Sequence, residues 1–65
     1  MTISEARNKV KNWSKKQKER VRKDVEFLTK FPRATKISAN TSFILEKCFR
    51  KDHSEIMPAD LLKFL

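Results

Sequence analysis

The chain has 65 residues, with sixteen Lys or Arg against eight Asp or Glu, one cysteine, one histidine and no glycine. A chain of this length forms at most one domain with one small core. One cysteine cannot form an internal disulfide, Cys48 and His53 are too few for a zinc site, and phosphate-binding loops and tight hairpins depend on glycine. We therefore expect a non-enzymatic, all-α module, with no cofactor and no metal.

The first predicted element is an amphipathic helix over residues 3–31. Its apolar side chains recur every three or four positions, which is the spacing of one helical stripe. They are Ile3, Ala6, Val10, Trp13, Val21, Val25, Leu28 and Phe31. Thr2 and Glu5 have the spacing of a capping box at its start. Pro32 ends it, because proline disfavours the helical conformation of the residue before it.

The middle of this segment allows two interpretations. Residues 14–20 contain no apolar side chain, and Gln17 occupies a position where the stripe requires one. Ser14 and Gln17 also have the spacing of a second capping box, which would begin a new helix. We predict one continuous helix, and two shorter helices joined near Ser14 are the alternative.

A second helix is predicted from Ser38 or Asn40, either of which can cap it, to about Lys51. Its core-facing side chains are Ile44, Leu45, Cys48 and Phe49. Phe43 projects from nearly the opposite side, so we expect this helix to be contacted on two faces, by its neighbours or by another chain. Trp13 and all five phenylalanines are assigned to the core.

A third helix is predicted to open at Pro58, which suits a first helical position, with Asp60 in the first turn. Apolar residues continue to Leu65 without a closing signal. We expect either that the chain is a fragment of a larger protein or that this end is buried against a partner. The predicted fold is a single three-helix bundle over residues 1–65, or a four-helix bundle if the first helix is divided.

The excess of positive charge is confined to one half of the chain. Residues 1–36 contain twelve Lys or Arg against four Asp or Glu, whereas residues 37–65 contain four of each. Ion pairs between residues four apart, such as Glu19 with Lys23 and Arg20 with Asp24, would occupy all four acids. Several cations would still be unpaired, namely Arg7, Lys11, Lys16 and Lys18.

This surplus predicts contact with nucleic acid through phosphates. The residues expected to carry it are Lys11, Lys15, Lys16, Lys18, Arg22 and Lys23. The amide side chains suited to base recognition that lie between these cations in the sequence are only Asn8, Asn12 and Gln17, so we expect little sequence preference. DNA and RNA are both left open. The run from Lys15 to Lys23 resembles a nuclear localisation segment, which favours a nuclear protein of transcription or chromatin.

Two other binding functions compete with this one. The apolar C-terminal segment and the two-faced second helix favour docking on a protein partner or a second copy, through Phe43, Leu61, Leu62, Phe64 and Leu65. A membrane-surface helix is the least favoured of the three. There is neither a signal peptide nor an apolar run long enough to span a bilayer, so we expect an intracellular protein.

An enzyme is not expected. Asp52, His53 and Ser54 carry the chemical groups of a catalytic triad. Consecutive side chains point in different directions, however, and cannot form the required relay.

Overall fold

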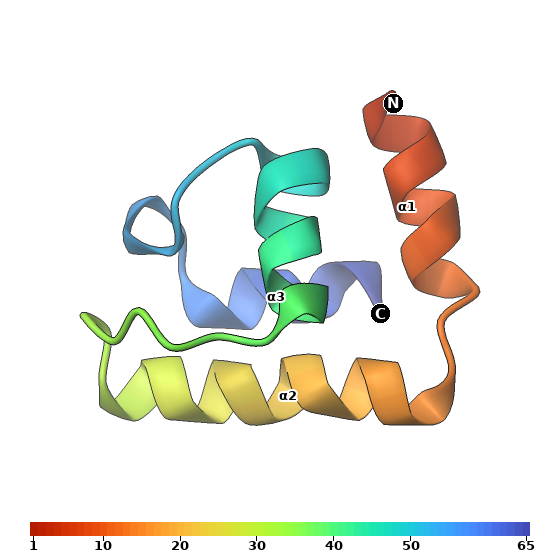
Figure 1. Ribbon diagram of the computed structural model, residues 1–65. Coiled ribbons are helices and arrows are strands. Elements are labelled where there is room, and N and C mark those ends of the chain that lie inside the picture. Colours follow the sequence, from red (N-terminus) through yellow and green to blue (C-terminus); the bar gives the residue numbers. More distant parts are fainter.

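A computed structural model describes all residues, 1–65, and its regular elements are all helical (Figure 1). The elements follow one another as α1 (Ile3–Lys11), α2 (Lys15–Lys30), α3 (Ala39–Phe43), the π-helix η1 (Ile44–Phe49), and the 3₁₀-helices η2 (His53–Glu55) and η3 (Pro58–Phe64). The predicted all-α class is confirmed. Because η1 continues α3 directly, the main helical segments number four.

The first helix is divided, so our preferred prediction of one continuous helix is wrong. The Ser14 hydroxyl accepts a hydrogen bond from the Gln17 amide, and Gln17 Oε1 accepts one from the Ser14 amide at 2.9 Å. This capping box begins α2, while Asn12 closes α1. The break lets each helix turn its own apolar face inward, which a straight rod with a polar middle could not do.

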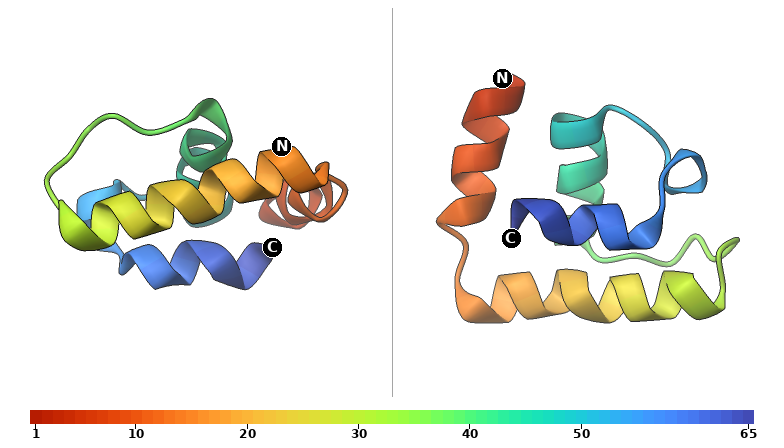
Figure 2. Two further views of the ribbon diagram at one scale, coloured as in Figure 1. Left: turned by 90° about the horizontal axis from the view of Figure 1, so that it is seen from below. Right: turned by 180° about the vertical axis from the view of Figure 1, so that it is seen from behind.

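The longest helix, α2, is the base on which the other elements pack. In Figure 1 it runs along the bottom of the molecule, and α1 stands across one of its ends. The view from below shows η3 running along one side of α2 and α3, seen nearly end-on, on the other side (Figure 2). Both of these elements contact α2, and α1 packs mainly against η1.

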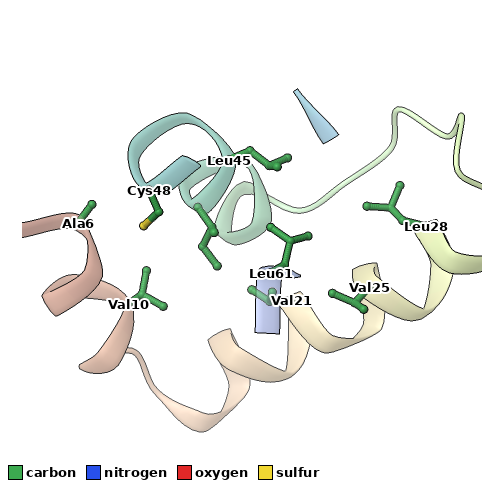
Figure 3. Packing of buried hydrophobic residues seen from close by; sticks show 9 residues of the cluster. Ala6, Val10, Val21, Val25, Leu28, Leu45, Cys48 and Leu61 are labelled. Atoms are coloured by element: carbon green, nitrogen blue, oxygen red, sulfur yellow. The ribbon is translucent and has the colours of Figure 1, made fainter. Parts of the chain in front are cut away.

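The core lies between these four segments (Figure 3). Its buried hydrophobic residues are Ala6, Val10, Val21, Val25, Leu28, Ile44, Leu45, Cys48 and Leu61. Trp13, Phe43, Phe49 and Phe64 are half-buried and pack against this cluster. The prediction that every aromatic ring belongs to the core fails for two residues, because Phe27 is 42% exposed and Phe31 is 56% exposed.

The exposure of Phe27 and Phe31 follows from the orientation of α2. Val21, Val25 and Leu28 face the core, and successive residues of an α-helix are about 100° apart, so Phe27 lies well away from that face. The two rings pack on one another instead, with their centroids 5.2 Å apart.

Ser38, one of the two predicted caps, is the N-cap of the second helical segment. Its hydroxyl accepts a hydrogen bond from the Thr41 amide, and the Thr41 side chain is fully buried. Asp24 of α2 accepts hydrogen bonds from the Ser38 amide at 3.0 Å, from the Ser38 hydroxyl at 2.6 Å and from the Thr41 hydroxyl. One carboxylate therefore joins α2 to the start of α3.

This segment ends at Arg50, slightly before the predicted Lys51. Arg50 has φ 55° and ψ 38°, the left-handed conformation that commonly follows a helix and that glycine adopts most readily. The amides of both Arg50 and Lys51 donate to the Leu45 carbonyl. The terminus is thus well hydrogen-bonded although its residue type is unfavourable.

Replacing Arg50 with glycine should make the protein more stable than replacing it with alanine. Both variants remove the same charge, but only glycine removes the Cβ that a left-handed residue places close to the following carbonyl. We expect a difference of about 1 kcal/mol, reduced by the greater freedom of glycine in the unfolded chain. Urea unfolding of the two variants measures it, and equal midpoints would contradict the argument.

The single thiol of the protein, that of Cys48, is buried and unreactive. Cys48 is 5% exposed within the core. Burial raises the pKa of its thiol above the ordinary value of 9.0, and the positive charge of Arg7 opposes that change only in part. The thiol is therefore protonated at neutral pH, and Cys48 acts as a small apolar core residue.

Candidate nucleic-acid interface

The cations of residues 1–36 lie at the surface without carboxylate partners. All twelve are exposed except Lys18, which is half-buried. The structure contains one salt bridge between charged side chains, Lys63 with Asp60 at 3.1 Å, and a contact of 4.0 Å between His53 and Asp52, and neither involves this half of the chain. None of the ion pairs that the four-residue spacing predicted forms in the structure.

Two of the four acids in this half have other hydrogen-bond partners. Glu5 accepts from the Thr2 amide and hydroxyl in the capping box of α1, and Asp24 is held by Ser38 and Thr41. The acids free to balance the cations are therefore Glu19 and Glu26. The number of cations without a carboxylate partner is therefore larger than the predicted ion pairs implied.

Six cations of α2 form two stripes along the helix. Lys15, Lys18 and Arg22 share the side that faces η3, which we call the η3-side stripe. Lys16, Arg20 and Lys23 share the side facing away from the molecule, which we call the outer stripe. The spacings of three and four residues place each set along one line of the helix surface.

The outer stripe is free of any covering element. Figure 2, seen from below, has α2 in front of all other segments. A shallow hollow there is lined by Lys16, Glu19, Arg20 and Lys23, all of them from α2. On the other side, Lys15, Arg22 and Lys23 line a hollow together with Leu62 of η3. The η3-side stripe is therefore flanked by protein, whereas on the outer stripe only Lys23 borders that hollow.

The six predicted binding residues do not form one surface. Lys16 and Lys23 belong to the outer stripe. Lys15, Lys18 and Arg22 form the η3-side stripe, and Lys11 lies at the end of α1.

Arg20 lies on the outer stripe but is not among the six predicted residues, and the four-residue spacing paired it with Asp24. Asp24 instead binds two residues that are fourteen and seventeen positions further along the chain. No local pattern in the sequence signals that contact.

Base recognition has little support in these side chains. The Gln17 side chain is engaged in the cap of α2, through the hydrogen bond to the Ser14 amide. Asn12 is the exposed C-cap of α1, and Asn8 lies on α1 facing the end of η3. Neither Asn8 nor Asn12 is on α2, where the stripes are. None of these three amide side chains is therefore available on the two stripes of α2.

The surface predicted for a protein partner is mostly used inside the chain. Leu61 is fully buried in the core, so the prediction that it contacts a partner is corrected. Phe43 packs on Trp13 with ring centroids 5.6 Å apart, and Phe64 packs on Phe49 at 4.8 Å. Leu65 is half-buried, which leaves Leu62 at 40% exposed.

An apolar recess of about 560 Å³ does exist elsewhere, between the end of α2 and residues 53–59. Leu28, Ile56 and Met57 contribute to its lining, and none of the five predicted partner-binding residues does.

None of the helices combines the length and the apolar composition that spanning a bilayer requires. No three His, Cys, Asp or Glu side chains gather where they could hold a metal ion. Comparison with known protein families, with curated proteins and with solved structures yields no match for this chain.

Proposed function

We propose that this protein binds nucleic acid through the phosphate backbone, with the outer stripe of α2 as its main contact. The observation that carries the proposal is the set of twelve cations in residues 1–36, none of which has a salt-bridge partner within the protein. An external polyanion would supply the missing counter-charge and release its own condensed ions.

The dimensions of α2 suit such a contact. Its sixteen residues form a rod of about 24 Å. On the uncovered side of this rod, Lys16, Arg20 and Lys23 span about 10 Å, which is the length of about three phosphates of one DNA strand along the duplex axis. Because α2 is held by α3 and η3, little ordering of its backbone is required on binding.

We expect binding that depends little on the base sequence. Cations without well-placed amide groups contact phosphates and leave the base edges unread, so affinity should vary little with sequence. The run from Lys15 to Lys23 keeps a nuclear location, in transcription or chromatin, as part of the same proposal.

A salt titration tests the proposal. We expect a fluorescently labelled 20-base-pair duplex to bind at low salt, as measured by anisotropy. If about four phosphates are contacted, raising monovalent salt from about 50 to about 200 mM should lower the binding constant on the order of a hundredfold. Scrambled duplexes of equal length should differ by much less than this.

Two results would contradict the proposal. One is the absence of binding at about 50 mM salt, since phosphate contacts are strongest there. The other is an affinity that does not change with salt, since it would exclude counterion release as the driving force. Repeating the titration with a hairpin RNA separates DNA from RNA as the preferred polyanion.

A further inference from the structure

A second group of cations lies away from α2, where α1 meets the end of η3. A hollow of about 450 Å³ there is lined by Ser4, Arg7, Asn8, Lys11, Lys63 and Phe64. We call it the α1–η3 notch. Three of its six residues are cationic, two are uncharged polar residues, and no carboxylate is among them. Its composition is that of a site for an anion.

Arg7 is held in a defined position in this notch. Its guanidinium carbon lies 4.5 Å from the centroid of the Phe64 ring, as in a cation–π contact. Phe64 is itself fixed by Phe49, whose ring meets it edge-on at 4.8 Å and 77°. Arg7 has no carboxylate partner, so the N–H groups on the edge of its guanidinium are left for a ligand.

The other polar groups surround Arg7 from two elements. Ser4, Asn8 and Lys11 lie on the same face of α1 as Arg7, because they are separated by three or four residues. Lys63 comes from η3, and its ammonium group is 3.1 Å from Asp60. That bridge is at the surface, with the Lys63 side chain 73% exposed, so an entering anion can compete for it.

The geometry points to a phosphate-binding site in the α1–η3 notch, with Arg7 as its central ligand. A guanidinium presents two parallel N–H donors that match two phosphate oxygens, and Lys11 and Lys63 add charge from either side. Asn8 and Ser4 supply neutral donors for the remaining oxygens. The phosphate belongs either to a nucleic-acid backbone or to a free nucleotide or inorganic phosphate. The site does not depend on the outer stripe of α2.

The first experiment follows the Arg7 side chain by NMR during titration with inorganic phosphate, with chloride at equal ionic strength as the reference. We expect a saturable shift of the Arg7 Nε–Hε resonance with phosphate only. In the variant Arg7→Lys, phosphate affinity, read from the Asn8 and Lys63 backbone amides, should fall about fivefold or more, because lysine lacks the paired donors. Phe64→Leu should lower it as well, by releasing Arg7.

The matched control is Arg33→Lys, which makes the same exchange at an exposed arginine of the connector. It should leave the titration unchanged. The proposal is overturned if chloride produces the same shifts as phosphate, or if Arg33 and Arg50 respond as strongly as Arg7. The wild-type titration distinguishes these outcomes even if a variant unfolds.

A second experiment identifies the source of the phosphate. If Arg7→Lys weakens duplex binding and Arg33→Lys does not, the notch takes a backbone phosphate. If duplex binding is unchanged while a nucleoside monophosphate shifts Arg7, the notch takes a free phosphate. Either result supports the site. Loss of duplex binding in outer-stripe variants is a separate readout, so failure of the notch and failure of the proposed function can be told apart.

Discussion

Replacing Asp24 with alanine is expected to destabilise the protein by about 3 kcal/mol, because three hydrogen bonds end on one carboxylate and one donor is a fully buried hydroxyl. The loss is large for a chain of this size, whose total stability should be about 3–10 kcal/mol. The melting temperature should therefore fall by about 10–20 °C. Calorimetry or thermal circular dichroism measures it.

Part of this loss is electrostatic. The first turn of α3 contains no acidic residue, so Asp24 of α2 supplies the negative charge beside its free amides. Asp24→Asn retains an oxygen acceptor without the charge, and its loss should be smaller than that of alanine.

A matched variant separates this role from a simple change of net charge. Glu26→Ala removes one carboxylate from the same helix at an exposed position, and we expect a change within about 0.5 kcal/mol. If Asp24→Ala were no more harmful than Glu26→Ala, the hydrogen bonds to Ser38 and Thr41 would not be holding α2 and α3 together.

The second large effect concerns affinity. Neutralising the outer stripe with Lys16→Gln, Arg20→Gln and Lys23→Gln together should weaken duplex binding on the order of a hundredfold at about 0.1 M salt, if all three side chains contact phosphates. The slope of log affinity against log salt should fall by about 2.7 for three lost contacts. Anisotropy titrations at several salt concentrations give both quantities.

The control removes the same charge from another surface. Lys30→Gln, Arg33→Gln and Lys36→Gln together affect exposed residues at the end of α2 and in the connector. This variant tests the general effect of net charge, so it should lose far less affinity and keep most of the slope. Equal losses in the two triple variants would mean that binding depends on total charge and has no preferred face.

Arg20 distinguishes the two descriptions of the charge on α2. If Arg20 were paired with Asp24, as the four-residue spacing suggested, its replacement would cost stability. In the structure Asp24 is held by α3, and Arg20 is exposed on the outer stripe. Its share of the triple variant should therefore appear in affinity while the melting temperature is nearly unchanged.

Most helix ends follow from sequence, because capping acts between residues three positions apart. Thr2 with Glu5, and Ser14 with Gln17, form the capping boxes that their spacing indicates. Whether Ser14 begins a new helix or lies within one could not be decided locally, since the same residues are tolerated in both. The division at Ser14 is favoured because it lets α1 and α2 bury their apolar faces at different angles.

The core shows the same division. The stripe Val21, Val25 and Leu28 was predictable from its period, as was the inward face of Ile44, Leu45 and Cys48. The exposure of Phe27 and Phe31 was not, because it depends on how far α2 rotates toward α3 and η3.

For the candidate sites, the amino-acid sequence shows that the excess of positive charge is confined to residues 1–36, because too few acids accompany the cations there. Only the packing of the helices shows which acids accept other hydrogen bonds, which stripe stays uncovered and which cations line a common hollow. Asp24 finds its partners far along the chain, and Lys63 meets Arg7 and Lys11 only because η3 ends against α1. Helical periodicity relates residues within one turn or two, whereas these contacts require the packing of separate helices.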